Sequence, residues 1–127
     1  MLTPLQQQLL QVRATLPQDV ELVAVSKFHP VEALQEAYDA GQRIFGESRV
    51  QELEQKRPLM PADTRWHFIG HLQANKVKYI APYVELIHAV DSLKLLIEID
   101  RQAARCERII HCLLQVHVAQ ENTKYGF

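Results

Sequence analysis

The sequence lacks several features that would assign it directly to a class of protein. Its 127 residues carry a net charge of −1 and contain no run of five or more basic residues, so its charge does not indicate binding to nucleic acid or an anionic membrane. No apolar stretch approaches the roughly 20 residues of a membrane-spanning helix, and the first residues lack the pattern of a signal peptide. We therefore predict a cytoplasmic protein with no membrane partner.

Cysteine pairs and glycine-rich motifs are also missing. Cys106 and Cys112, the two cysteines, form no CxxC pair, which favours free thiols in a reducing compartment over a disulfide or a zinc site. Neither GxGxxG nor GxxxxGK[ST] occurs, which argues against the common nucleotide-binding folds. With 47% hydrophobic and 23% charged residues, the chain has the composition of a globular domain.

Helical and extended segments alternate along the chain. An N-terminal helix is predicted at about 3–16, because Thr3, Pro4 and Gln6 form a helix-start signal and Pro17 ends the pattern. The strands predicted after it are 21–27, 43–46, 66–70, 85–90 and 109–118. The first of these is continuously apolar and valine-rich in its middle, as expected for a strand buried on both faces of a parallel sheet.

The spacing of these strands predicts the fold class. Strands that alternate with helices at intervals of about 19 to 24 residues indicate βαβ units and a parallel α/β sheet. The regular interval fits a TIM-type (β/α) barrel better than a doubly wound sheet. A closed barrel needs eight strands and roughly 200 residues or more, so only about the first five β/α units are present within the single domain 1–127. The alternatives are a barrel fragment and an incomplete sheet, and two open sheet edges would favour association.

Three residues are expected to bound helices. Gly41 is predicted to end the helix that follows Pro30, in a left-handed conformation. Ser48, three residues before Gln51, has the spacing of a capping box for the next helix. Ser92 is predicted to cap the helix after the fourth strand.

Lys27 is the strongest candidate for chemistry. It closes the first predicted strand, so its amine is expected at the carboxyl end of the sheet, where α/β barrels place their active sites. An amine in a partly desolvated pocket loses its proton more readily, and only the neutral amine attacks an aldehyde. The alternative is a strand-end lysine without a role, whose stem lies on the core while its charge reaches water.

Other strand ends bring Glu47, Gly70, Asp91 and His117 to the same mouth. The two carboxylates suit a chemical role, and equally a favourable interaction with helix N-termini. Gly46 and Gly70 allow the close backbone approach that a flat ring needs, and equally suit plain turns.

Two further residues were candidates for the site. His67 alternates with Phe68 along a strand, so it either lines the barrel interior or is a hydrogen-bonded core histidine. His67 and His71 have the spacing of a zinc-binding helix, but Phe68 stands where that motif has its glutamate, so no metal site is predicted. Lys124 lies in the polar segment 121–126 as a second amine on the mouth side, where a plain surface lysine is the default interpretation.

Together these segments resemble the pyridoxal-phosphate homeostasis protein family, whose members are single-domain relatives of the alanine racemase N-terminal barrel. The matches keep the family's order from about residue 20 onward. They comprise Val23–Lys27, Phe45–Glu47 with Val50–Glu52, Trp66–Gln73 with Asn75–Lys76, His88–Ser92, and the final loop Glu121–Gly126. An apolar strand ending in Ser-Lys and the Trp-His-Phe-Ile-Gly segment are the most specific of them.

The resemblance implies a protein that carries pyridoxal 5′-phosphate (PLP) as a Schiff base on Lys27 and serves PLP homeostasis without robust catalysis. It also implies transient PLP-requiring apo-enzymes as partners and a monomeric state for the full-length protein. Glu47, His67 and Gly70 would surround the cofactor, and Lys124 would bind it at a second site. Ser48-Arg49 replaces the family's common Asn-Tyr pair. The family's phosphate- and ring-nitrogen-binding residues come from its C-terminal half, so none is assigned in this chain.

Two other functions remained open. One is a racemase-like PLP enzyme that uses Lys27 as one base, which also needs a second proton-transfer group on the other face of the cofactor. The other is an inactive fragment with no function of its own.

Overall fold

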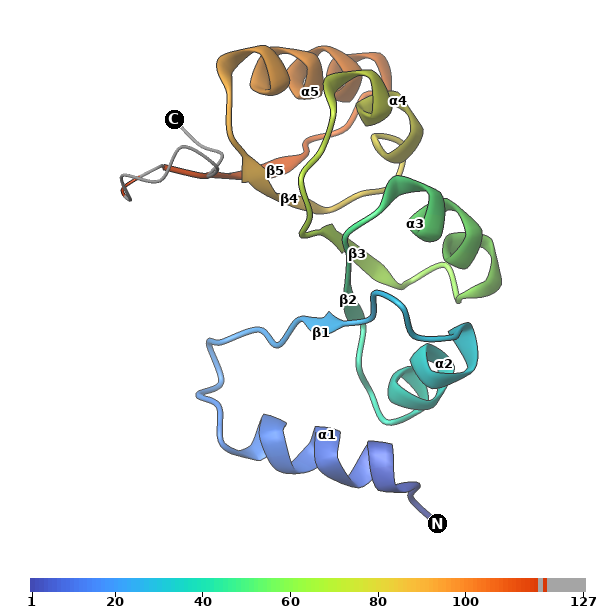
Figure 1. Ribbon diagram of the computed structural model, residues 1–127. Helices are drawn as coiled ribbons and strands as arrows, with labels where there is room; N and C mark the ends of the chain where they lie inside the picture. The colour runs from blue at the N-terminus through green and yellow to red at the C-terminus, as the bar shows by residue number, and fades with distance from the viewer. Residues whose placement is uncertain (117, 119–127) are drawn as a thin grey trace.

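The computed structural model describes residues 1–116 and 118, in which five short parallel strands form one curved sheet with helices along one side (Figure 1). The elements are α1 (Pro4–Ala14), β1 (Ala24–Val25), α2 (Val31–Asp39), β2 (Ile44–Glu47), α3 (Val50–Lys56), η1 (Arg57–Leu59), β3 (Arg65–Phe68), η2 (Ala74–Lys76), α4 (Val77–Ile80), β4 (Leu86–Val90), α5 (Leu93–Arg105) and β5 (His111–Leu114). The predicted alternation of strands and helices is therefore confirmed.

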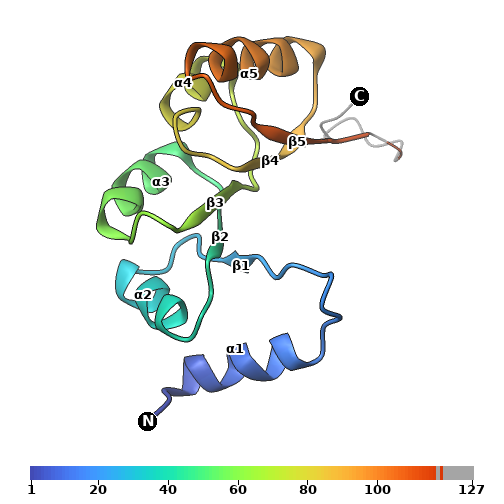
Figure 2. The ribbon, with the colours of Figure 1, turned by 180° about the vertical axis from the view of Figure 1, so that it is seen from behind.

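The strand order is β1-β2-β3-β4-β5, so each strand pairs in parallel with the next one along the chain. A doubly wound sheet reverses direction at a switch point, whereas a barrel winds in one direction. The order observed has no reversal and is that of the first five units of a (β/α) barrel. Seen from behind, α2 to α5 again follow the outer side of the arc (Figure 2).

The core lies between the sheet and this layer of helices. Phe45, Trp66 and Phe68 are each 1–2% exposed, and the register places Phe45 beside Trp66 on the neighbouring strand. The helices contribute buried residues to the same cluster, which include Leu34, Leu53, Val77, Ile80, Leu95 and Ile99. Burial of this apolar surface is the main favourable term that holds each helix on the sheet.

Helix α1 begins as its sequence predicts. Thr3 and Gln6 form the capping box, with the Gln6 backbone N–H donating to Thr3 Oγ1 at 3.2 Å. The Gln6 side chain donates to the carbonyl oxygen of Glu36 at 2.9 Å, which ties α1 to α2. A mainly apolar cavity of about 320 Å³ separates parts of α1 from β1 and α2.

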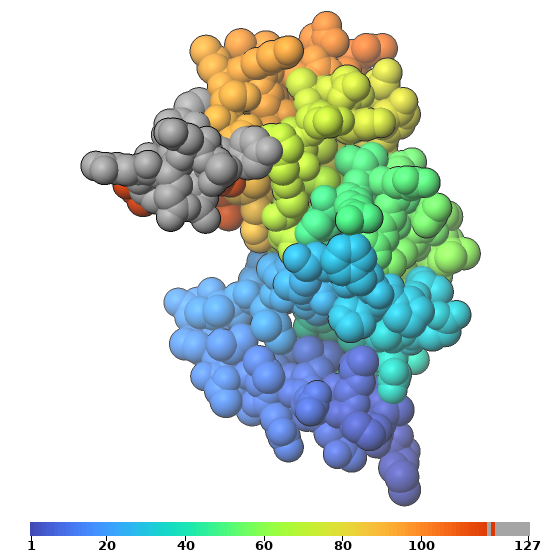
Figure 3. Space-filling model, in the orientation of Figure 1, coloured from blue at the N-terminus to red at the C-terminus, as the bar shows by residue number. Residues whose placement is uncertain are grey.

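The first strand is shorter and more exposed than predicted. Strand β1 spans Ala24–Val25 instead of 21–27, and Val25 is 53% exposed. The prediction of burial on both faces is wrong because β1 lies at the edge of the sheet and pairs with β2 alone within the described part of the chain. The space-filling view shows the N-terminal region and the α5 region at opposite ends of an open arc (Figure 3).

The last strand is also shorter than its apolar pattern suggested. Strand β5 covers His111–Leu114 instead of 109–118, and Leu113 and Leu114 are 50% and 57% exposed. It forms the other edge of the sheet, pairing with β4 alone among the described strands. Residue 117 of the predicted strand lies outside the described residues.

Two of the three predicted helix boundaries are confirmed. Gly41 has a φ of +104° after α2, and Ser92 Oγ accepts a hydrogen bond from the Leu95 backbone N–H at 3.2 Å. The capping box at Ser48 is wrong, because α3 begins at Val50 with Arg49 at the cap position and no side-chain cap bond. The backbone of Ser48 instead packs against Gly70, where an added Cβ would lie 2.3 Å from the Ser48 carbonyl oxygen.

Two sequence features can be placed directly. Cys106 and Cys112 are both free, partly buried thiols. Of the helices in residues 1–116, none is long and apolar enough to cross a membrane.

Candidate functional site

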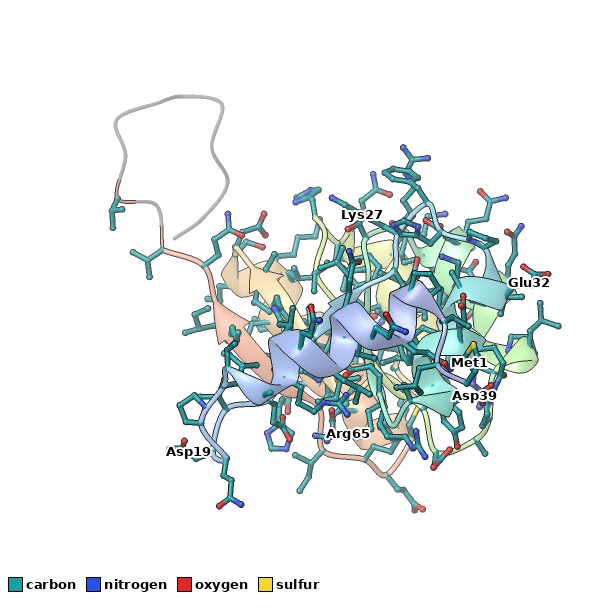
Figure 4. All side chains as sticks on the ribbon, turned by 90° about the horizontal axis from the view of Figure 1, so that it is seen from below. Met1, Asp19, Lys27, Glu32, Asp39 and Arg65 are labelled. Atoms are coloured by element: carbon teal, nitrogen blue, oxygen red, sulfur yellow. The ribbon has the colours of Figure 1, made fainter. Side chains whose placement is uncertain are left out.

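The carboxyl ends of the parallel strands form a common edge, which we call the rim. The segments that leave β1, β2, β3 and β4 at the rim carry, respectively, Lys27, Ser48, His71 and Asp91. Figure 4 shows Lys27 on the opposite side of the molecule from Arg65, which begins β3 at the other end of the sheet. The predicted position of Lys27 at the carboxyl end of the sheet is therefore observed.

The shelter predicted for Lys27 is not observed. The residue is exposed in the turn between β1 and α2, and no described residue makes a hydrogen bond or ion pair with its ammonium group. The reason is the edge position of β1, because the exposed Val25 just before it shows that this side of the strand is uncovered in the described part of the chain. The side chain is an accessible primary amine at the rim.

The two residues beside Lys27 are firmly held, in contrast to its side chain. Ser26 is 3% exposed, and its backbone N–H donates to the Gly46 carbonyl oxygen at 3.0 Å. The Phe28 backbone N–H donates to Glu52 Oε2 at 2.7 Å. Phe28 has a φ of +66°, a left-handed conformation that is costly for a bulky residue and persists only where surrounding contacts enforce it.

A buried ion cluster behind the rim also binds the backbone on both sides of Lys27. It consists of Ser26, Glu47, Glu52 and Lys56, and we call it the Lys56 cluster. Lys56 Nζ donates to the Ser26 carbonyl oxygen at 2.8 Å, to Glu47 Oε2 at 2.9 Å and to Glu52 Oε2 at 2.8 Å. The Ser26 hydroxyl donates to Glu47 Oε2 as well. An ammonium group has three donors, so the hydrogen-bonding capacity of Lys56 is fully used.

Glu47 lies inside the molecule and not in the open mouth. It is 0% exposed, and its Oε1 has no hydrogen-bond partner within the described structure. Burial raises the pKa of Glu47, and the hydrogen bonds from Ser26 and Lys56 oppose that rise. Removing Lys56 would therefore leave an acid whose charged form has lost its counter-ion.

The pKa of Glu52 is shifted in the opposite direction from that of Glu47, because Glu52 is nearer to solvent. Partial burial acts to raise its pKa, but the hydrogen bonds from Lys56 and from the Phe28 backbone N–H lower it overall. Its side chain is 19% exposed, against 9% for that of Lys56. Glu52 is consequently an ionised acceptor that joins α3 to the Lys27 turn.

His67 is a hydrogen-bonded interior histidine. It is 4% exposed, its Nδ1 lies 3.0 Å from His88 Nε2, and its Nε2 lies 2.8 Å from Glu85 Oε2. Glu85 also accepts from Arg65 Nε at 2.8 Å. Both ring nitrogens of His67 have partners, so direct contact with a cofactor would require one of these bonds to be exchanged.

The two glycines near the rim lie where a side chain would be crowded, moderately at Gly46 and severely at Gly70. A Cβ at Gly46 would lie 3.1 Å from the side chains of Val23 and Ile69, and one at Gly70 would clash with the backbone of Ser48. Gly70 thus holds the loops after β2 and β3 together.

The rest of the rim carries polar and basic groups. His71 Nδ1 lies 3.1 Å from Asp91 Oδ2, which joins the loops after β3 and β4. A cavity of about 610 Å³ lies between α3 and the loop after β3, and its lining includes Arg49, His71 and Lys76. Lys27 does not line this cavity.

Sequence reasoning missed the Lys56 cluster. Glu52 and Lys56 have the i, i+4 spacing of an ordinary surface pair, and nothing local distinguishes them from one. Burial of Lys56 arises where α3 packs against β2 and the Lys56 side chain reaches the Ser26 carbonyl oxygen just after β1, a contact between distant segments. Lys124 and His117, also proposed from the sequence, lie outside the described residues.

The fold and the rim define a class: the first part of a (β/α) barrel with an accessible amine after its first strand. The chain belongs to the family described as alanine racemase, N-terminal domain, whose model matches residues 2–127. The pyridoxal phosphate homeostasis protein of Schizosaccharomyces pombe is 46% identical over 110 residues, covering 85% of this chain and 46% of that protein.

Solved structures agree with this assignment. PipY of Synechococcus elongatus, in a structure with PLP bound, has 40% identity and a TM-score of 0.89, covering 97% of this chain and 57% of PipY. Alanine racemase of Enterococcus faecalis matches in fold, with a TM-score of 0.77 at 17% identity over 97% of this chain and 34% of that one. The chain spans about half the length of the curated relatives it matches.

Proposed function

We propose that this chain is the Lys27-bearing part of a PLP homeostasis protein, which carries the cofactor covalently without robust catalysis. The observation that supports the proposal is a primary amine at the rim that has no partner among the described residues, on a turn whose flanking residues are held by hydrogen bonds. A relative 40% identical to the chain has been solved with PLP bound, and several curated relatives are named for PLP homeostasis.

One residue of the chain, Lys27, has the chemistry needed to bind an aldehyde cofactor covalently. PLP supplies an aldehyde, which condenses with a primary amine and releases one water. Lys27 supplies that amine, and its exposure leaves the nitrogen accessible. Lys56 is the other lysine beside this turn, but it is 7% exposed and all three of its donors are used.

The names of the curated relatives support the carrier role over a racemase-like role. Racemisation needs proton-transfer groups on both faces of the cofactor. Among the described residues, the imidazole of His67 has both nitrogens hydrogen-bonded, and Glu47 is enclosed with Lys56. Delivery of PLP to apo-enzymes and a cytoplasmic location complete the proposal.

The test is to map where PLP attaches. The chain is incubated with PLP, treated with borohydride to reduce the new C=N bond to a stable amine, and analysed by peptide mass spectrometry. We expect the adduct mainly at Lys27, its loss in Lys27→Ala, and no change at Lys27 in the control Lys78→Ala, which removes an exposed lysine of α4. Equal labelling of all exposed lysines would contradict the proposal.

Function is tested separately from attachment. Amino-acid racemisation is assayed with added PLP, and the carrier role predicts no turnover above that of free PLP. Fast turnover that disappears in Lys27→Ala would support the racemase-like alternative.

A further inference from the structure

The turn that carries Lys27 is held from behind by the Lys56 cluster, on both sides of the lysine. On one side, Lys56 Nζ donates to the Ser26 carbonyl oxygen at 2.8 Å. On the other side, the Phe28 backbone N–H donates to Glu52 Oε2 at 2.7 Å, and the same oxygen accepts from Lys56. A single carboxylate oxygen thus connects the buried ammonium group to the residue that follows Lys27.

Besides connecting α3 to the sheet, the cluster restrains the backbone of the turn that carries Lys27. Phe28 has a φ of +66°, so the turn has a backbone conformation that relaxes readily unless it is held. The Glu52 carboxylate binds the N–H of this strained residue directly. The Cα–Cβ direction of Lys27 depends on the backbone angles around it, and these are the angles that the cluster restrains.

Electrostatics makes the cluster a unit and not a set of independent bonds. Glu47 is fully buried and needs the Lys56 ammonium group as its counter-ion, and the Ser26 hydroxyl donates to the same Glu47 oxygen. Loss of one charge therefore disturbs the others. Lys56 and Glu52 come from α3, 29 and 25 residues along the chain from Lys27, so this restraint exists only in the folded protein.

We propose that Lys56 and Glu52 are positioning residues that fix the β1–α2 turn and so direct the Lys27 amine toward an aldehyde ligand at the rim. The inference rests on the proposed function of Lys27, and it assigns neither residue a contact with the cofactor. Both act through the backbone of Ser26 and Phe28.

Two variants test the inference. Glu52→Ala removes the acceptor of the Phe28 N–H at a side chain that is 19% exposed. The double variant Lys56→Met/Glu47→Gln removes both buried charges together, so that neither remains unpaired. Glu54→Gln is the matched control, because Glu54 lies on the same helix but bonds to Tyr83 Oη at 2.6 Å, outside the cluster.

The first measurement is amide hydrogen exchange of the protein without ligand. We expect the Phe28 amide to exchange about tenfold faster or more in both variants. The Ile69 amide, which donates to the Glu47 carbonyl oxygen within the sheet at 2.8 Å, reports on the core and should keep its wild-type rate in Glu52→Ala. A loss of packing throughout the chain would accelerate both amides together.

The second measurement is the ratio of Lys27 to Lys78 adducts after limited reaction with PLP and borohydride. The variants are expected to lower this ratio by about fivefold or more, because Lys78 lies outside the cluster and corrects for general reactivity. The Glu54→Gln control should keep the wild-type ratio. If the double variant does not fold, Glu52→Ala decides the question.

The outcomes separate the two proposals. A wild-type chain without preference for Lys27 would end the proposed function and this inference with it. A wild-type preference that both folded variants retain would overturn the inference alone. Faster exchange at Phe28 with an unchanged adduct ratio would also overturn it, because the cluster would then hold the turn without directing Lys27.

Discussion

The ammonium group of Lys56 lies 2.8 Å from the carbonyl oxygen of Ser26, the residue immediately before Lys27. Two lysines therefore lie beside one backbone segment, Lys27 exposed and without a partner among the described residues, Lys56 buried and fully hydrogen-bonded. The environments of the two lysines give them different roles. A buried ammonium group whose three donors are all used by acceptors has a structural role, whereas an accessible amine is free to react.

Lys56→Met is predicted to destabilise the chain strongly. It leaves the fully buried Glu47 without its counter-ion, and breaking a buried pair on one side costs about 3–5 kcal/mol. Lys56→Met/Glu47→Gln should recover part of this loss, because the fully buried residue 47 then carries no charge that needs a counter-ion. Urea denaturation measures both, and a single variant as stable as wild type would show that the pair contributes nothing.

Gly70→Ala is predicted to destabilise more than Gly46→Ala. At Gly70 the new Cβ would lie 2.3 Å from the Ser48 carbonyl oxygen, and two backbone segments must separate. At Gly46 it would meet side-chain atoms at 3.1 Å, which can shift by a few tenths of an ångström. We expect losses of about 2–3 kcal/mol and about 1 kcal/mol respectively, measured by denaturation. Equal losses would contradict the close approach at Gly70.

His88 is predicted to make the chain less stable as the pH falls from 7 to 5. Burial lowers its pKa below the ordinary value of 6.5, and the neighbouring His67 acts in the same direction. The unfolded chain then binds the proton more readily than the folded one, so stability declines as pH falls through 6.5 toward the folded-state pKa.

The matched variant for this prediction is His88→Gln. Denaturation at pH 7 and at pH 5 should show that this variant loses less stability between the two pH values than the wild type does. Glu85 does not interfere, because its pKa lies below the usual 4.5 and its contribution is lost only in more acidic solution. An unchanged pH dependence in His88→Gln would contradict the assignment to His88.

The two sheet edges are predicted to promote self-association of the 127-residue chain. Strands β1 and β5 are paired on one side only in the described structure, and Val25 and Leu114 on them are 53% and 57% exposed. Charged residues on edges oppose strand pairing. Val25→Lys/Leu114→Lys should therefore lower the average mass in sedimentation experiments.

A lysine placed elsewhere controls for added charge in that experiment. Ile97 on α5 is 58% exposed but does not belong to a strand, so Ile97→Lys should leave the association unchanged. A monomeric wild-type chain at high concentration would refute the prediction. If Ile97→Lys lowered the average mass as much as Val25→Lys/Leu114→Lys, the cause would be the added charge and not the strand edges.

Much of the architecture was predictable from local patterns. The alternation of apolar strands and amphipathic helices predicted a parallel sheet, and chain direction alone placed Lys27 at the carboxyl end of β1. Thr3, Gly41 and Ser92 bound helices as predicted, because capping depends on neighbours a few residues away. Ser48 broke the pattern, because its backbone packs against Gly70 in the loop after β3.

The sequence by itself determined the order of the elements, their parallel arrangement and the amine that follows the first strand, since these depend on spacing and direction along the chain. Only the tertiary structure decided how exposed that amine is and what holds its turn. Exposure of Lys27 follows from the edge position of β1, and the Lys56 cluster forms when α3 packs against β2 and Lys56 reaches Ser26 and Glu47. Burial and pairing of charges are properties of contacts between distant segments, which local sequence patterns do not encode.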